Sequence, residues 1–148
     1  MSPRSLAQRK ADTLARLDAD DDAWIATADS QGRAHLVPLS VWWDGEVLTM
    51  TTAATSRTAR NALASGHARI AFGDTRDVVV FDTAVASISV AGAPEHLSSG
   101  FVARCGWDPA SNDGDWVYLL LRPVRIQAWR EEDEIEGRTL MRDGRWLT

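Results

Sequence analysis

The middle of the chain carries hydroxyl and guanidinium side chains that could bind an anion. Thr55 or Ser56 is a natural N-cap for a predicted helix that ends at Gly66. The unpaired backbone N–H groups of its first turn would then lie beside Arg57 and Arg60. Phosphate is favoured there because the helix dipole, the free donors and a bidentate guanidinium act in the same direction. A capped surface helix with solvated arginines would explain the same residues, so other parts of the chain must decide.

The predicted helix belongs to a strand–loop–helix unit. Residues 48–52 alternate in the period-two pattern of a half-buried strand, and small residues connect them to the helix. Arg57 would lie in the first helical turn, whereas Arg60 lies almost a turn later and can point outward. We therefore expect Arg57 to be the stronger ligand of an anion.

The remaining pattern predicts a meander of strands with short helices. Alternation and β-branched residues predict strands at 24–28, 34–43, 46–52, 67–72, 77–90, 116–121 and 124–129. Helices are predicted at 5–17 and 94–105, and Asp143-Gly144 predicts a late hairpin. Pro38 should distort its strand or place it at an edge, and Pro123 should interrupt the last two strands.

These elements predict a mainly β fold: a small β-barrel of six or seven antiparallel strands, decorated by short helices. The length of 148 residues fits one domain. We expect an N-terminal helix within residues 1–20 and a C-terminal arm over residues 130–148.

Composition narrows the class of function. The net charge of -5 and the pI near 5.1 argue against a nucleic-acid-binding surface. No apolar run approaches the ~20 residues of a membrane span, and the N-terminus lacks a signal-like apolar core. We therefore expect a cytoplasmic protein. Seven tryptophans are too many for a small core, and they favour a homodimer or a planar ligand.

The other reactive side chains show no pattern typical of catalysis. His35, His67 and His96 lack metal-binding spacing, and we predict no metal. We expect a structural role for the single Cys105. The acidic clusters at 18–22 and 131–136 are expected to form solvated faces.

The order of these parts resembles the split-barrel flavin and deazaflavin reductase superfamily, which has the fold of pyridoxamine 5'-phosphate oxidase. The resemblance extends from Ala23 to Trp146. It is carried by Ala26-Thr27-Ala28, Gly32, Val37-Pro38-Leu39, Asp44-Gly45, Leu48 to Asn61, Arg122-Pro123, Arg125-Ile126, Trp129 and Arg138. A further segment, with Phe101, Gly106-Trp107 and Asp108-Pro109, resembles the actinobacterial branch that uses coenzyme F-420.

The resemblance implies a cofactor-binding role for several residues. Ser56, Arg57 and Thr58 would bind phosphate, with Asn61 in the same segment; Thr51 and Thr52 would contact the ring or ribityl chain; and the backbone at Pro38, Leu39 and Ser40 would meet the ring edge. Trp129 would pack near the ring from the second subunit of a homodimer, although a core role explains an isolated tryptophan equally well. Many members carry a lysine where this chain has Thr58, and its absence lowers the expected affinity for FMN.

Two classes of function follow from this resemblance. The first is an oxidoreductase that uses reduced coenzyme F-420 to deliver hydride to a small acceptor, with FMN as the alternative cofactor in a pyridoxamine-phosphate-oxidase-like enzyme. The cofactor carries the reactivity in such enzymes, so we assign no catalytic residue. The second is a non-catalytic module of the same fold that sequesters a flavin, haem or another planar ligand.

Overall fold

A closed antiparallel barrel forms the body of the protein, and the computed structural model describes residues 2–148. The barrel strands are β1 (Asp22–Ala28), β2 (Ala34–Trp43), β3 (Leu48–Ala53), β4 (His67–Asp74), β5 (Asp77–Ser89) and β6 (Trp116–Trp129). They follow the order β3-β2-β1-β4-β5-β6, and pairing of β3 with β6 closes the barrel. A hairpin of β7 (Thr139–Arg142) and β8 (Arg145–Trp146) extends the sheet beyond β6. The mainly β split-barrel prediction is confirmed, with the late hairpin added to the six barrel strands.

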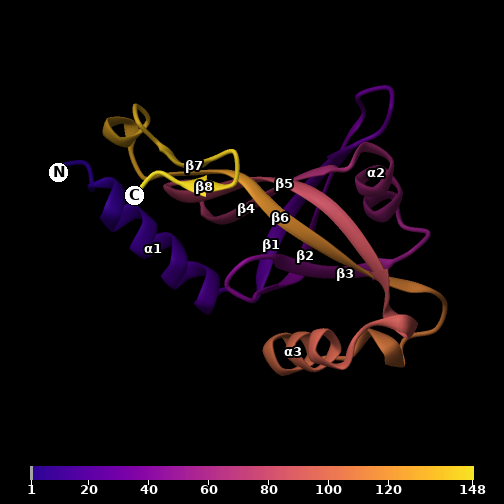
Figure 1. Ribbon diagram of the computed structural model, residues 1–148. Helices are drawn as coiled ribbons and strands as arrows, with labels where there is room; N and C mark the ends of the chain where they lie inside the picture. Colours follow the sequence, from indigo (N-terminus) through magenta and orange to yellow (C-terminus); the bar gives the residue numbers. More distant parts are fainter. Residues whose placement is uncertain (1) are drawn as a thin grey trace.

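Three α-helices surround this barrel within the described residues, and Figure 1 shows their arrangement. They are α1 (Leu6–Ala19), α2 (Arg57–Ser65) and α3 (Glu95–Cys105), with short 3-10 turns η1 (Val90–Gly92), η2 (Pro109–Ser111) and η3 (Glu132–Glu134). Helices α1 and α2 lie toward opposite ends of the barrel (Figure 1), and α3 packs against β2. The two ends of the chain are close together, since the Lys10 Nζ atom donates to the Thr148 carbonyl oxygen at 2.9 Å. No helix of residues 2–148 is long and apolar enough to cross a membrane.

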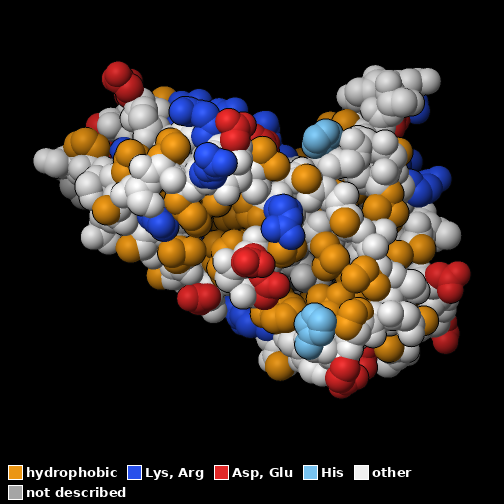
Figure 2. Space-filling model, in the orientation of Figure 1, with side chains coloured by type: hydrophobic (Ala, Val, Ile, Leu, Met, Phe, Trp, Pro, Cys, Tyr) orange, Lys and Arg blue, Asp and Glu red, His pale blue; other side chains and the backbone are white. Residues whose placement is uncertain are grey.

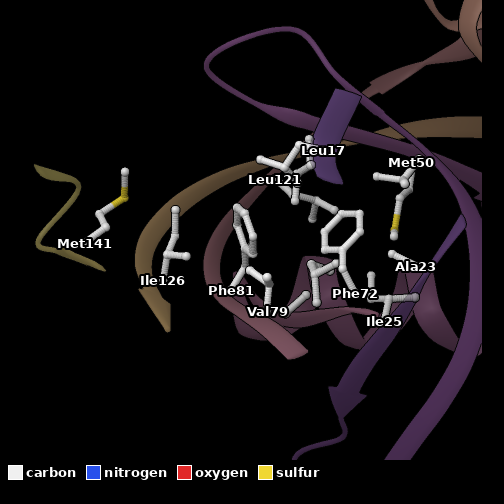
Figure 3. Packing of buried hydrophobic residues seen from close by; sticks show 14 of the residues in the cluster. Leu17, Ala23, Ile25, Met50, Phe72, Val79, Phe81, Leu121, Ile126 and Met141 are labelled. Carbon is white, nitrogen blue, oxygen red and sulfur yellow. The ribbon is translucent and has the colours of Figure 1, made fainter. Parts of the chain in front are cut away.

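The barrel interior is filled by inward-facing apolar side chains. Ile25, Ile70, Phe81 and Ile126 pair in one row across β1, β4, β5 and β6, and all four are fully buried. Figure 3 shows the Phe72 ring beside Phe81. Their ring centroids are 5.7 Å apart. This dry core fixes the strand register, because a slip of one residue would turn the row outward.

A second apolar cluster lies outside the barrel, under α3. Leu97 and Phe101 of α3 pack against Tyr118 of β6 and the partly buried Trp42 of β2. Both faces of β3 are therefore covered, which explains why Leu48 to Thr52 are all buried.

The two prolines within strands have different outcomes. Residues 34–40 of β2 pair only with β1, and β3 joins β2 at residues 41–43. Pro38 therefore lies on a partly free edge, as predicted. The predicted interruption at Pro123 is wrong, because β6 is continuous from Trp116 to Trp129. A register shift between Asp82 and Thr83 of β5 accommodates the proline as a local irregularity.

The acidic segment 131–136 was expected to form a solvated face, and this expectation is wrong for Glu134. This side chain is only 2% exposed. Its carboxylate accepts hydrogen bonds from the Arg4 Nη2 atom and the Arg130 backbone nitrogen, both at 2.8 Å. The Arg9 guanidinium lies 3.9 Å away. Glu134 thus ties the N-terminal helix to the C-terminal arm.

Candidate cofactor-binding site

Helix α2 begins and ends at the residues that the sequence indicated. The Ser56 hydroxyl caps it by accepting a hydrogen bond from the Ala59 backbone nitrogen at 3.1 Å. Gly66 ends the helix in the left-handed conformation, with φ of 73°, which a side chain would disfavour. Thr52 at the end of β3 donates to the Ser56 hydroxyl at 3.1 Å. This contact fixes the strand–loop–helix unit around the first turn of α2.

A cavity of about 530 Å³ lies between α2 and the hairpin that joins β1 to β2. We call it the arginine cavity; it is lined by Asp29, Ser30, Arg33, Ala34, Arg57, Arg60, Asn61 and Ala64. Arg57 and Arg60 are exposed and form no ion pair with a residue in the described range 2–148. Arg60 is exposed and lines the same cavity as Arg57, so both arginines are within reach of one ligand. Arg33 adds a third guanidinium to the cavity wall, and its charge is paired with that of Asp29.

Arg33 is the site residue that the sequence analysis missed. The Asp29 carboxylate accepts from the Arg33 Nε atom at 2.7 Å and from its backbone nitrogen at 3.0 Å. The guanidinium and the two backbone donors of the hairpin hold the pKa of Asp29 below its usual value, so it is ionised near neutral pH. The sequence spacing of Asp29 and Arg33 across a predicted turn could have indicated that the two side chains pair. It could not have indicated that Arg33 lines the cavity, because this depends on the position of α2 opposite the turn.

Asn61 connects α2 to the barrel. Its side-chain nitrogen donates to the Thr27 hydroxyl of β1 at 3.2 Å, and both side chains are buried. Thr58, in the position where a phosphate lysine was expected from the resemblance, is also buried. Its hydroxyl is therefore shielded, and Arg57 is the exposed cation at the helix start.

Thr51 and Thr52 lie on opposite faces of β3, because successive residues of a strand alternate. The Thr52 hydroxyl contacts Ser56 beside α2. The Thr51 hydroxyl donates instead to the Val117 carbonyl oxygen at 2.9 Å. Thr52 therefore lies at the start of α2, whereas the Thr51 hydroxyl is hydrogen-bonded to β6.

Pro38, Leu39 and Ser40 lie along the partly free edge of β2. Pro38 is exposed, whereas Leu39 and Ser40 are half-buried. The Ser40 hydroxyl accepts a hydrogen bond from the Trp107 ring nitrogen at 3.1 Å. This contact joins the β2 edge to the loop after α3, where the Trp107 ring packs edge-on against Trp116.

Trp129 is remote from α2 along the barrel. It pairs with Val78 at the last position of β6, whereas Trp116 at the first position pairs with Ala53, close to α2. The Arg138 guanidinium lies over the Trp129 ring, 5.2 Å from its centre. The structure therefore does not bring Trp129 and Arg57 together within one chain.

Cys105 and the histidines lie apart from the arginine cavity. Burial raises the pKa of the Cys105 thiol to about 11, so the reactive thiolate is scarce near neutral pH. The three histidines are also absent from the cavity wall. Within residues 2–148, no group of three or more histidine, cysteine or acidic side chains could hold a metal.

The barrel strands and their closure define a split-barrel protein with an arginine-lined cavity at α2. The sequence model of the pyridoxamine 5'-phosphate oxidase family matches residues 12–130, and the chain belongs to this family. No curated protein matches the sequence at a significant level.

Solved structures share the fold at low sequence identity. An F-420 reductase is 19% identical, with a TM-score of 0.61 over 76% of this chain and 93% of the other. A putative pyridoxamine 5'-phosphate oxidase from Listeria innocua is 11% identical, with a TM-score of 0.65 over 80% and 96%. A haem storage protein from Vibrio cholerae is 14% identical, with a TM-score of 0.60 over 79% and 92%. These similarities establish the fold alone, and the fold is shared by proteins of different function.

Proposed function

We propose that this protein is a cytoplasmic oxidoreductase that uses reduced coenzyme F-420 to deliver hydride to a small acceptor. The arginine cavity is the observation that carries this proposal. Arg33, Arg57 and Arg60 meet there, although the chain has a net charge of -5. Three separate guanidiniums suit a ligand whose negative charge is spread over a phosphate and several carboxylates.

The residues of the cavity fit the charged part of this cofactor. Arg57 and the first N–H groups of α2 would bind the phosphate, with Ser56 and Thr52 fixing the helix start. Thr58 would add a hydroxyl only after a small opening, since its side chain is buried. Arg60 and Arg33 would bind the tail carboxylates.

The ring of the cofactor would lie along the β2 edge. The backbone at Pro38, Leu39 and Ser40 is free on the side away from β1, and it would hold the ring edge. Thr52 and Asn61 would border the ring or its side chain, whereas Thr51 would act by holding β3 to β6. The deazaflavin ring supplies hydride-transfer chemistry when bound, and the protein orients it and excludes water.

We also propose that the protein acts as a homodimer. Trp24 of β1 and Leu36 of β2 are 47% and 58% exposed, and they lie on the outer face with Pro38, the strand partner of Trp24. Such an apolar patch is a typical interface, and a second copy is the simplest partner. A dimer would also allow Trp129 to approach the α2 site of the other subunit.

FMN binding, as in a pyridoxamine-phosphate-oxidase-like enzyme, is the alternative that family membership favours. A non-catalytic module that binds a planar ligand is the second alternative. For haem, the arginines would suit the propionates, but His35, His67 and His96 do not line the cavity. That arrangement offers the iron no imidazole ligand in the arginine cavity.

Equilibrium binding to F-420, FMN and haem, combined with an absorbance spectrum of the purified protein, tests the proposal. We expect saturable binding of F-420 that is lost in Arg57→Ala. Tight haem binding with no F-420 binding would show that the protein is a haem-binding module. Binding of F-420 without oxidation of its reduced form by any acceptor in a broad panel would argue for sequestration rather than catalysis.

A further inference from the structure

A second cavity lies where the start of α3 meets the outer face of the barrel. We call it the α3 cavity; its volume is about 330 Å³. It is lined by Asp44, Val47, Thr49, Ala84, Val85, Ala86, Ile88, Pro94, His96, Leu97, Leu120 and Arg122. It shares no lining residue with the arginine cavity. Figure 2 shows hydrophobic side chains gathered at the surface where α3 approaches the strands, with charged side chains around them.

The floor of the α3 cavity is an apolar strip built by strand register. Thr49 of β3 pairs with Leu120 of β6, and Leu120 pairs with Ala86 of β5. Two positions along the same strands, Arg122 pairs with Ala84. The two alanines leave the floor low, and the start of α3 stands above it as a wall. This depth accommodates a small organic molecule, because the volume reaches the range typical of ligand pockets.

Polar groups are few and lie beside the apolar floor. Thr49 is 1% exposed and contributes its side chain to the cavity wall. The Arg122 side chain is exposed and makes no ion pair with residues 2–148. His96 adds an imidazole in the first turn of α3. A hydroxyl at the cavity wall and a guanidinium without an ion pair can both donate hydrogen bonds to a carboxylate.

The acidic groups near the α3 cavity are already engaged. Asp44 lies on its rim, but the Asp44 Oδ1 atom accepts from the backbone nitrogens of Glu46 and Val47, both at 2.8 Å. Glu95, next to His96, accepts from the Ser99 hydroxyl at 2.9 Å. Arg122 is therefore the guanidinium at this cavity that makes no ion pair within residues 2–148, and Asp44 is an anionic neighbour on the rim.

We propose that the α3 cavity is a second ligand site and that it binds a small carboxylic acid with an apolar body. The apolar body packs on Leu120, Ala86 and Leu97. The carboxylate accepts from Arg122 and from the Thr49 hydroxyl. The site does not depend on the proposed function, because it shares no lining residue with the arginine cavity and involves no cofactor.

Titration with 3-phenylpropionate, compared with the neutral 3-phenylpropanol, tests this site by calorimetry or by amide chemical shifts. We expect the acid to bind with Kd of about 1 mM or tighter and the alcohol about tenfold more weakly. Ala86→Leu fills the floor and should abolish binding, and Arg122→Gln should weaken it at least about fivefold. Arg125→Gln is the matched control, since Arg125 lies exposed on the same strand outside the cavity.

Other outcomes would overturn the proposal. Absence of saturable binding by the acid would contradict a ligand site in this cavity. Equal binding of the acid and the alcohol would contradict recognition of a carboxylate. Loss of binding in Arg57→Gln but not in Arg122→Gln would place the acid in the arginine cavity instead. Thermal unfolding of each variant shows whether it is folded. If Ala86→Leu does not fold, Arg122→Gln is the variant that decides.

Discussion

Asp29 holds Arg33 by its Nε atom, at 2.7 Å, across the turn between β1 and β2. The two terminal nitrogens of the guanidinium remain available to a ligand, because Nε is the atom that Asp29 binds. An arginine fixed in this way loses less side-chain freedom when it binds an anion. The pair therefore prepares one wall of the arginine cavity, opposite α2.

We predict a graded loss of F-420 affinity from the three arginine variants. Arg57→Ala should cost about 1.5 to 3 kcal/mol, because this residue is the first of α2 and lies beside the free N–H groups. Arg60→Ala and Arg33→Ala should each cost less, since they act on the tail. Fluorescence titration measures all three, with Arg76→Ala as an exposed control outside the cavity. Equal losses at Arg57 and Arg60 would mean that the phosphate is not held at the helix start.

We predict that F-420 binds more tightly than FMN by more than about tenfold, or 1.4 kcal/mol. FMN concentrates its charge on one phosphate, and the position of the expected lysine is occupied by the buried Thr58. F-420 distributes its charge over groups that several arginines can bind. Parallel titrations decide the matter, and FMN binding as tight as F-420 binding would reverse the cofactor assignment while leaving the fold unchanged.

We predict that Trp24→Glu converts a dimer into a monomer. The substitution places a charge on the exposed apolar face of β1 and β2, where a second copy would have to desolvate it. Light scattering at micromolar concentration measures the change, and Ala103→Glu on the exposed face of α3 is the control. A monomeric native protein under these conditions would contradict the dimer itself.

We predict that stability falls between about pH 5 and pH 2 through Glu134. The Arg4 guanidinium lowers the pKa of Glu134 from 4.5 to about 2 in the folded protein. Because the pKa of Glu134 is lower in the folded state than in the unfolded state, its ionised form stabilises the folded protein at pH values above the unfolded-state pKa. This stabilisation is lost as the pH falls toward the folded-state pKa. The full shift is worth about 3 kcal/mol near neutral pH.

Chemical denaturation of Glu134→Gln at pH 7 and pH 3 measures this contribution. The variant should lose about 2 to 4 kcal/mol at pH 7, because Arg4 and Arg9 are left beside a neutral group. It should also lose most of the acid dependence. Glu132→Gln is the control, since that side chain is exposed, and it should change stability by less than about 0.5 kcal/mol. An acid dependence that persists in Glu134→Gln would assign it to other carboxylates.

We predict that Gly100→Ala destabilises the protein by about 1 kcal/mol or more, although alanine normally favours a helix. A Cβ atom at Gly100 would meet the Trp42 ring directly. Thermal unfolding measures the loss. Repeating the change in a Trp42→Phe background is the control, where the smaller ring should make Gly100→Ala neutral or stabilising. The same loss in both backgrounds would exclude the ring contact as the cause.

Local signals were sufficient for most of the elements. Ser56 and Gly66 define the two ends of α2 in the sequence, because capping and left-handed conformation depend on residue type alone. Asp143-Gly144 likewise joins β7 to β8 as predicted. Pro123 was misleading, because the pairing of β6 with β5 on both sides of the proline outweighs the local cost of a missing donor.

Local residue preferences and periodicity in the sequence determined a small β-barrel with short helices, the start of α2 and the presence of Arg57 in its first turn. The split-barrel class followed from the resemblance of the ordered motifs to a known superfamily. Tertiary packing decided the rest. It set Arg33 opposite α2, gave the Thr51 and Thr52 hydroxyls different partners, and separated Trp129 from Arg57. It also buried Glu134 between arginines that come from the other end of the chain. These relationships join residues distant in sequence, and only the packing of strands and helices around one core brings them together.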